Sequence, residues 1–367
     1  MHLVSCIMYL ASNVQYLTSE KTMLKSYFKG SLIFTIIAII AGFFLGAGSS
    51  MNIAGGLQAV FIVLILGILE TSLSFDNAIV NATVLKDMSP RRQHRFLTRG
   101  MVIAVFGMRV IFPILIVAIV GNINPIQTIN LAIFNPDLYA QILTSSHIVI
   151  AGFGGAFLFM VALNFFLDIE KQNHWIGPIE RFLKKIGELK SIEIIITAII
   201  LMFVAKLLPS GEVLSFLTSG MRGVIVFAIV DGLAEILKKK KEVTQTMAKA
   251  GLSLFLYLEV LDASFSFDGV VGAFALSKNI FIIALGLGIG AMFVRSLTIM
   301  LVRKGTLAKY KYLEHGAFWA ILALAVIMFI TTLHEVPEVI TGLLGAGFIG
   351  IALLSSIRAN KIENQKK

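Results

Sequence analysis

Long apolar stretches alternate with short polar connections along almost the whole chain. An α-helix needs about 20 residues to cross a hydrocarbon core of roughly 30 Å. Ten stretches approach that length, and we expect each to form a transmembrane helix: 31–50, 58–83, 100–121, 147–168, 192–208, 220–237, 250–276, 280–302, 315–333 and 339–357. The pattern therefore predicts an all-α, polytopic membrane protein with about ten transmembrane helices.

The composition agrees with this prediction and leaves little chain for a soluble domain. Of the 367 residues, 57% are hydrophobic and only 14% are charged, which is more apolar than the core of a soluble domain requires. Cys6 is the only cysteine, which excludes an intramolecular disulfide and a cysteine-rich metal site. No nucleophile-and-base arrangement, phosphate-binding loop or zinc-protease helix is present. We therefore expect no enzymatic activity and no permanently bound cofactor.

The basic residues gather in alternate connections. Most of the 31 Lys and Arg residues lie in the segments 21–29, 86–99, 171–190, 238–249, 303–311 and 358–367, whereas the connections between them carry almost none. Cytoplasmic loops of membrane proteins retain Lys and Arg, so we expect a multi-pass protein with both termini in the cytoplasm. The net charge of +10 is then explained by the membrane rather than by a nucleic-acid partner.

The same patterns divide the chain into five segments. Residues 1–29 form a cytoplasmic N-terminal segment, in which Met23 is an alternative start that would leave 1–22 outside the protein. Residues 30–168 form a first membrane repeat, and 169–191 form a cytoplasmic linker that includes an amphipathic stretch suited to the membrane interface. Residues 192–357 hold an extra helix, the second membrane repeat and a final helix, and 358–367 form a cytoplasmic tail.

Two of the predicted spans carry the same polar motif. The motif beginning at Glu70 reads ETSLSFDN, and the one beginning at Asp262 reads DASFSFDG. In each half the following span holds an arginine, Arg109 or Arg295, nine residues after a glycine. Because the motifs lie five spans apart, they cross the membrane in opposite directions. The sequence thus predicts two inverted-topology repeats, which are typical of secondary transporters with a binding site near the midplane.

Five carboxylates lie inside these two spans: Glu70, Asp76, Glu259, Asp262 and Asp268. An ionised side chain at the bilayer centre costs about 2.5 to 3.5 kcal/mol on insertion scales. Each carboxylate therefore needs a partner, a proton or a bound cation.

The spacing of the first motif separates its two carboxylates on a regular helix. Glu70 shares one stripe with Ser74, Asn77 and Asn81, whereas Asp76 lies about 120° away. The two carboxylates converge on one site only if the helix unwinds near the Ser-Phe-Asp sequence, or if the antiparallel helix supplies the second ligand. Unwinding would also free backbone carbonyls as ligands, as in the broken helices of transporters.

The ligands on offer are carboxylates, an amide, hydroxyls and carbonyls. Hard oxygen ligands suit Mn²⁺, Ca²⁺ or Mg²⁺ rather than Zn²⁺ or Cu⁺. The alternative interpretation is that Arg109 and Arg295 pair with the carboxylates as counter-ions in buried structural ion pairs, a role that the fork geometry of arginine suits.

These residues carry a resemblance to a known family. The motifs beginning at Glu70 and Asp262, together with Arg295, resemble the TerC-like integral membrane family over nearly the whole chain from about residue 25. The most similar branch is a bacterial one defined only as a domain of unknown function. The family is placed among the lysine-exporter-type transporters. The resemblance implies metal-ion efflux, often of Mn²⁺, a link to tellurium resistance, and a place in the inner membrane of a bacterium.

The resemblance also implies which residues bind the cation: Glu70, Asp76, Asn77, Asp262 and Asp268. Further candidates in the same spans are Ser74, Asn81, Glu259 and Ser266. The second motif departs from the first because Gly269 stands where the first has Asn77. The sequence leaves open whether both halves contribute equally to the site.

Two functional hypotheses follow. In the first, the protein exports a divalent cation that is its substrate, and its partners are the lipid bilayer and the metal ion. In the second, it is a non-transporting membrane scaffold that recruits stress-response or metal-handling proteins, and the buried charges serve only as ion pairs. The sequence names no protein partner.

Overall fold

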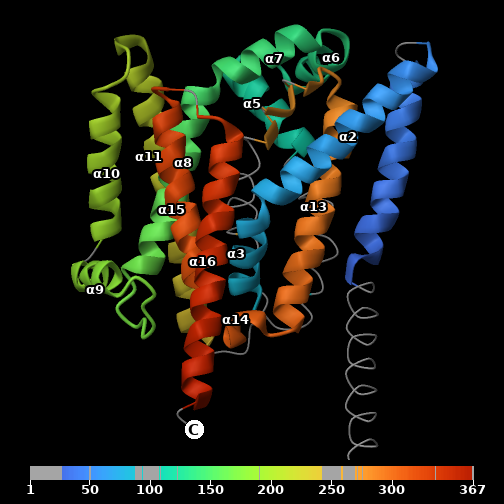
Figure 1. Ribbon diagram of the computed structural model, residues 1–367. Coiled ribbons are helices and arrows are strands. Elements are labelled where there is room, and N and C mark those ends of the chain that lie inside the picture. The colour runs from blue at the N-terminus through green and yellow to red at the C-terminus, as the bar shows by residue number, and fades with distance from the viewer. Residues whose placement is uncertain are drawn as a thin grey trace, which may run out of the picture.

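The computed structural model describes residues 27–48, 51–86, 109–121, 123–189, 191–241, 276–334 and 336–365, together with residues 93, 107, 258, 269, 270 and 272–274. Every regular element in these ranges is a helix, which confirms the all-α prediction for the described part of the chain (Figure 1).

The described helices begin with Tyr27–Gly48, which precedes α2 (Ile53–Leu73). The chain continues through α3 (Phe75–Lys86), α5 (Phe112–Val120), α6 (Pro125–Phe134), α7 (Pro136–Ser145), α8 (His147–Phe166), α9 (Gly177–Ile186), α10 (Ile192–Ala205), α11 (Ser210–Lys241), α13 (Ile280–Arg303), α14 (Thr306–Lys309), α15 (Leu313–Thr331) and α16 (Glu338–Gln365).

Seven segments of the described helices are long and apolar enough to cross a membrane. They are Tyr27–Gly48, Ile53–Leu73, His147–Phe166, Ser210–Gly232, Ile280–Arg303, Leu313–Thr331 and Ile340–Glu363. The chain is therefore a multi-pass membrane protein, as predicted. The predicted spans 100–121 and 250–276 fall largely outside the described residues, so the count of ten and the division into inverted repeats stay predictions.

The helix in the predicted span 192–208 is shorter than expected. It contains α10, which has 14 residues and falls short of the about 20 needed to cross the hydrocarbon core. The helix begins directly after Ser191, whose backbone lies in the left-handed region with φ of 58°. The helix ends before Pro209, whose ring disfavours helical geometry at the residue before it.

The connection 122–146 forms two short helices that the apolar pattern did not reveal. Each begins at an Asn-Pro pair, because asparagine caps a helix start and proline fits its first turn. The side chain of Asn124 accepts a hydrogen bond from the backbone N–H of Ile126 at 2.9 Å in α6, and that of Asn135 from Leu138 at 3.5 Å in α7.

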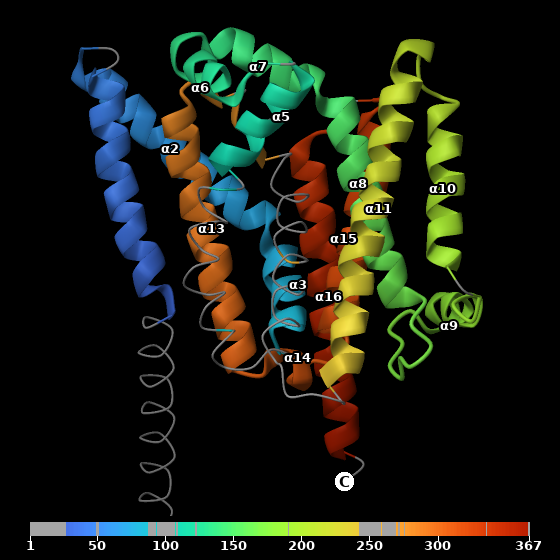
Figure 2. The ribbon, with the colours of Figure 1, turned by 180° about the vertical axis from the view of Figure 1, so that it is seen from behind.

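The helices form two packed groups that meet at α3, α15 and α16. In the first group α8 lies between α11 and α15, and in the second α13 packs along α2 and α3 (Figure 2). Phe157, Phe166 and Phe216 are fully buried in the first group. Large apolar side chains such as Phe61 and Leu214 stay exposed on the outside, as expected of a surface covered by lipid.

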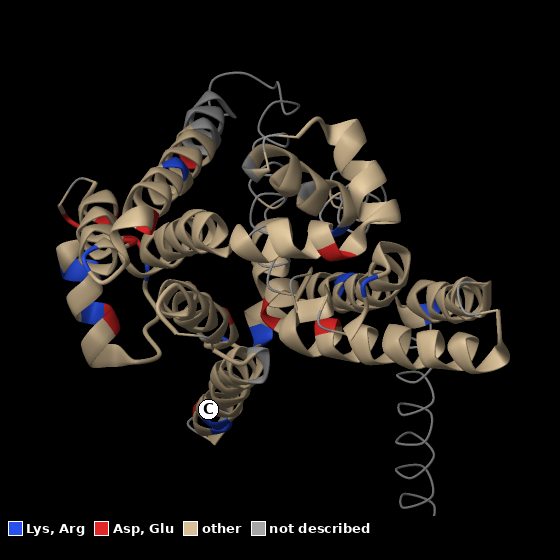
Figure 3. Cartoon of the chain, turned by 90° about the horizontal axis from the view of Figure 1, so that it is seen from above, with Lys and Arg blue, Asp and Glu red and all other residues tan. Residues whose placement is uncertain are grey.

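The described basic segments lie at one end of the molecule. The ends of α3, α13 and α16 lie there with α9 and α14, whereas α6 and α7 lie at the opposite end (Figure 1). The last turns of α3, α9, α13 and α14 carry Lys86, Lys184, Arg303 and Lys309. Seen from above, charged residues are few among the described helices, most of which are tan (Figure 3). This arrangement agrees with the alternation of basic and non-basic connections in the sequence.

Candidate functional site

The predicted span 58–83 is not one helix but two, with a break at Ser74. There α2 ends at Leu73 and α3 begins at Phe75, and Ser74 itself has φ of −99° and ψ of 20°. Its hydroxyl donates a hydrogen bond to Oε1 of Glu70 at 2.9 Å, a local bond of the kind that lets serine compete with regular helix geometry. The break places Glu70 in the last turn of α2 and Asp76 in the first turn of α3.

Glu70 is buried, with 2% of its surface exposed, and forms an ion pair with Arg109. Nη2 of Arg109 donates to Oε1 of Glu70, the oxygen that also accepts from Ser74. The C-terminal end of a helix carries a partial negative charge, which stabilises a cation there. The guanidinium of Arg109 therefore neutralises both the carboxylate and the end of α2.

Asp76 and Asn77 are buried at the start of α3, each with 6% of its surface exposed. Oδ1 of Asp76 accepts a hydrogen bond from the backbone N–H of Asn77 at 3.0 Å, and the N-terminal end of α3 favours a carboxylate. Oδ1 of Asn77 has no hydrogen-bond partner among the described residues. Because a buried oxygen without a partner is costly, this carbonyl is suited to receive a ligand. Asn81, one turn further on, is also buried.

The break opens on a cavity of about 910 Å³. Glu70, Ser74, Asp76 and Asn77 line one wall, so the carboxylates that a regular helix would separate face the same space. The other walls include side chains from the end of α7, the start of α8, the end of α15 with the residues that follow it, and the first part of α16: Thr144, His147, Thr331, Thr332, His334 and Thr341.

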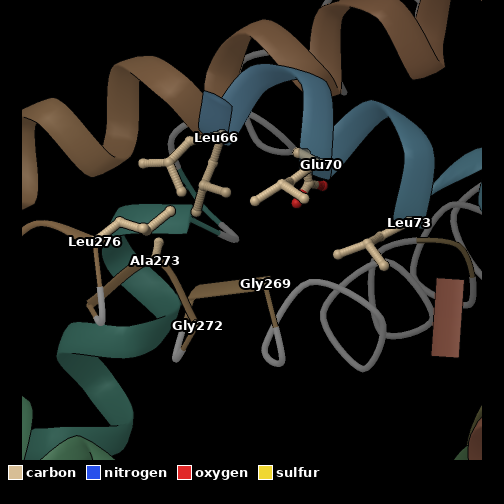
Figure 4. A pocket seen from close by; sticks show the side chains of 9 residues that line it. Leu66, Glu70, Leu73, Gly269, Gly272, Ala273 and Leu276 are labelled. Atoms are coloured by element: carbon tan, nitrogen blue, oxygen red, sulfur yellow. The ribbon is translucent and has the colours of Figure 1, made fainter. Parts of the chain in front are cut away.

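Glu70 also lines a second, smaller cavity of about 300 Å³ (Figure 4). The other described residues around it are apolar residues and glycines: Leu66, Leu69, Leu73, Gly269, Gly272, Ala273, Leu276 and Leu287. Glu70 thus lies between a large cavity with polar groups in its walls and a small apolar one.

Gly269, the last residue of the second motif, lies against the first motif. A β-carbon at position 269 would be 2.8 Å from Oε2 of Glu70. This contact explains why the second motif has glycine where the first has Asn77, because a side chain there would displace the carboxylate. The other predicted residues of this half, Glu259, Asp262, Ser266 and Asp268, lie outside the described residues.

Glycines also bring α13 close to α2. A β-carbon at Gly286 would be 2.6 Å from Cβ of Leu66, and one at Gly290 would overlap the side-chain stem of Glu70. Small residues at such positions let helix backbones approach closely. The crossing therefore holds α2 against α13 at Glu70.

Arg295, the second predicted counter-ion, lies half-buried on α13. Its Nη1 is buried, and in the described part of the chain neither a hydrogen-bond acceptor nor a carboxylate lies within reach of it. The acids of the second motif, its expected partners, are outside that part.

The described residues supply two carboxylates and an amide to one cavity. They contain no group of three or more His, Cys, Asp or Glu side chains arranged to hold a metal ion. A site of higher coordination number would need the acids of the second motif, backbone carbonyls or water.

The sequence did not reveal a third buried acid, Glu180 in the linker helix α9. Its side chain is fully buried, with Oε2 lying 2.8 Å from Nδ1 of His315 and Oε1 accepting from Nε1 of Trp319 at 3.1 Å. The backbone N–H of Trp175 donates to Oε2 at 3.0 Å. No local pattern marks this acid, because His315 and Trp319 lie more than a hundred residues further along the chain.

Its surroundings hold Glu180 in the charged form. Burial alone raises the pKa of Glu180, but the hydrogen bond and charge of His315, with Lys171 and Trp319, outweigh it and lower the pKa to about 2. Nζ of Lys171 lies 3.7 Å from Oε2 of Glu180, and burial lowers the pKa of Lys171 to about 8. The cluster fixes α9 to the first turn of α15.

Comparison with known families places the chain. The model of a family described as Protein of unknown function (DUF475) matches residues 75–363. The chain belongs to this family. No curated protein and no solved structure matches it. The match confirms that the family is one of unknown function, and the predicted TerC-like relationship is taken up as a proposal below.

Proposed function

We propose that this protein is a TerC-like transporter that exports a divalent metal cation, of the Mn²⁺ or Ca²⁺ type, bound between two acidic helices near the bilayer midplane. The observation that carries the proposal is the helix break at Ser74. It turns Glu70, Asp76 and Oδ1 of Asn77, which has no hydrogen-bond partner among the described residues, toward one cavity of about 910 Å³. Ionisable groups inside a membrane-spanning segment mark ion pathways, because their burial is otherwise too costly.

The electrostatics of the break favour a cation. The C-terminal end of α2 presents carbonyl oxygens beside Glu70, and half-helix C-termini with freed carbonyls coordinate cations in transporters. Carboxylate, amide and carbonyl oxygens are the ligands that Ca²⁺, Mg²⁺ and Mn²⁺ prefer. Glu70, Asp76 and Asn77 line one cavity, and none of the described residues around it is a cysteine, so a hard divalent ion is the expected substrate.

Contacts of the second half support a shared site. Gly269 lies beside Glu70, because a β-carbon at position 269 would be 2.8 Å from Oε2 of Glu70. Asp268 directly precedes Gly269 in the sequence. Leu258 packs with Leu85 at the end of α3, whereas Ala273 belongs to the same cluster as Leu66 on α2. These contacts suit a second acidic segment that runs antiparallel to the first, as an inverted repeat requires.

The basic residues at one end of the molecule suggest from which side of the membrane the large cavity is open. If they face the cytoplasm, the large cavity lies on the outer side of Glu70. It is lined by the start of α8 and the end of α15, which lie at the end opposite α9 and α14 (Figure 1). The described arrangement then corresponds to a site open toward the outside.

Flux through purified protein in liposomes tests the proposal. We expect Mn²⁺ or Ca²⁺ flux that is lost in Asp76→Asn and in Asp268→Asn. Asp137→Asn is the matched control, because Asp137 is an exposed acid on α7 that pairs with Lys278 at the surface, and its flux should be unchanged. Full flux in both Asp76→Asn and Asp268→Asn would refute the site assignment.

The ion pair between Glu70 and Arg109 favours the alternative function, a non-transporting scaffold in metal or tellurite stress whose buried charges are structural. A thermal-shift titration with Mn²⁺, Ca²⁺ and Mg²⁺ separates the two. A ligand that binds only the folded state raises the melting temperature. A rise with cation that is absent in Asp76→Asn supports the transporter, whereas no rise with any of the three cations supports the scaffold.

A further inference from the structure

Arg109 occupies the place where a cation would meet Glu70. Its guanidinium contacts Oε1 of Glu70, and both groups are buried, with 7% and 2% of their surfaces exposed. The carboxylate is at the C-terminal end of α2, where the helix itself attracts positive charge. A cation arriving through the large cavity would therefore compete with a positive charge that is already present.

The geometry of the pair suits a partner that can be exchanged. Arginine binds carboxylates most strongly when two parallel N–H groups reach both oxygens. Here both side-chain hydrogen bonds, from Arg109 and Ser74, go to Oε1. Oε2 instead faces Gly269 of the second motif. One oxygen is held while the other is turned toward the second half of the site.

We propose that Arg109 is a tethered competitor of the transported cation for Glu70. It neutralises the carboxylate while the site is empty, and the divalent cation displaces it on binding. The role rests on the proposed transport function and adds to it, because it explains how an empty site avoids an unpaired buried charge. If the pair of Arg109 and Glu70 were purely structural, it would stay intact when the cation binds and during transport.

Competition predicts that removing the guanidinium strengthens cation binding. Arg109→Gln leaves Glu70 without its charged partner, so the empty protein should melt at a lower temperature than the unaltered protein. Its Kd for Mn²⁺ should fall about tenfold, the size of a typical coupling between two ligands. Mn²⁺ should then raise its melting temperature by more than it raises that of the unaltered protein, because stabilisation by a ligand grows as Kd falls.

The matched control is Arg222→Gln, the same substitution at an exposed arginine on α11, which should change neither Kd nor the Mn²⁺-induced shift. Arg109→Lys covers the case in which Arg109→Gln does not fold. Lysine keeps the charge but lacks the planar fork, so its Kd should lie between those of the unaltered protein and a protein without the charge. Methylguanidinium added to Arg109→Gln should weaken Mn²⁺ binding again, whereas tetramethylammonium at the same concentration should not.

The outcomes separate the two proposals. If Mn²⁺ binds the unaltered protein, is lost in Asp76→Asn, and binds Arg109→Gln and Arg109→Lys no more tightly than the unaltered protein, the role of Arg109 is refuted and the cation site stands. If Mn²⁺ binds neither the unaltered protein nor any variant, both proposals fail together.

Discussion

Gly269 lies so close to Glu70 that a β-carbon at position 269 would come within 2.8 Å of Oε2. The atom it would meet is the end of a flexible side chain, so Gly269→Ala should displace the carboxylate rather than the backbone. We expect a change in the free energy of unfolding below about 1 kcal/mol together with weaker Mn²⁺ binding. Isothermal titration and thermal unfolding of the same preparation measure both, and unaltered affinity would show that Oε2 does not contact the ion.

Gly290 lies on the other side of Glu70 and should respond differently. A β-carbon there would overlap Cβ and Cγ of Glu70 and lie 3.0 Å from the backbone nitrogen of Thr71, so α2 and α13 would have to move apart. We expect Gly290→Ala to lower the free energy of unfolding by about 1 to 3 kcal/mol, as overpacking does.

Gly347 on α16 is the control for that substitution, because no described residue lies within 4 Å of a β-carbon at its position. There alanine should stabilise the helix by about 0.5 to 1 kcal/mol. Equal effects at positions 290 and 347 would contradict the close crossing of α2 and α13.

The carboxylate of Glu180 should contribute far more to stability than a surface acid. Replacing it with glutamine removes the charge that His315 and Lys171 face and should cost about 1.5 to 3 kcal/mol, the range for hydrogen bonds to charged groups. Glu314→Gln is the comparison, because Glu314 pairs with Lys86 at the partly exposed surface and should cost under about 1 kcal/mol. Chemical unfolding of both variants in detergent checks the difference.

The same acid predicts a pH dependence. The pKa of Glu180 is about 2 in the folded protein, against an ordinary value of 4.5, so the unfolded chain binds its proton first as the pH falls. Its contribution to stability is therefore complete above pH 4.5 and declines as the pH falls from 4.5 through 2. The difference in melting temperature between the unaltered protein and Glu180→Gln should shrink over that interval, and a constant difference would contradict the charged state of Glu180.

Lys171 predicts a change in stability at alkaline pH. Burial lowers its pKa from 10.5 to about 8, so between these values the unfolded chain holds a proton that the folded protein has lost. Stability should rise with pH from about 8 to 10.5 because of this group. Lys171→Met removes the group, and the melting temperature of this variant should lack that part of the rise.

Much of the fold follows from hydrophobic length alone. Seven described helices lie where apolar runs predicted them, because a run of about 20 apolar residues has few other stable states in lipid. The two helices of 122–146 lack such a run and depend on Asn124 and Asn135 as caps. The shortness of α10 depends on local backbone geometry at Ser191, which the apolar pattern does not contain.

The candidate site was predictable in its chemistry but not in its pairings. Counting buried acids and arginines showed that partners were needed, and the Ser-Phe-Asp sequence marked where unwinding was required. That Arg109 meets Glu70 through a single oxygen depends on how the helices pack. Glu180 was hidden because a linker acid among lysines is usually solvated, and only the tertiary fold brings His315 and Trp319 to it.

The buried contact of α9 also has a mechanical consequence. Glu180 fixes the linker to the first turn of α15, beside Phe165 and Phe166 at the end of α8, whereas the large cavity is lined by the opposite ends of those two helices. At the cavity, Nε2 of His147 at the start of α8 lies 3.2 Å from the backbone carbonyl oxygen of Thr331 at the end of α15. Widening the cavity between these helix ends would require breaking that contact, whereas Glu180 holds α9 against the far end of α15.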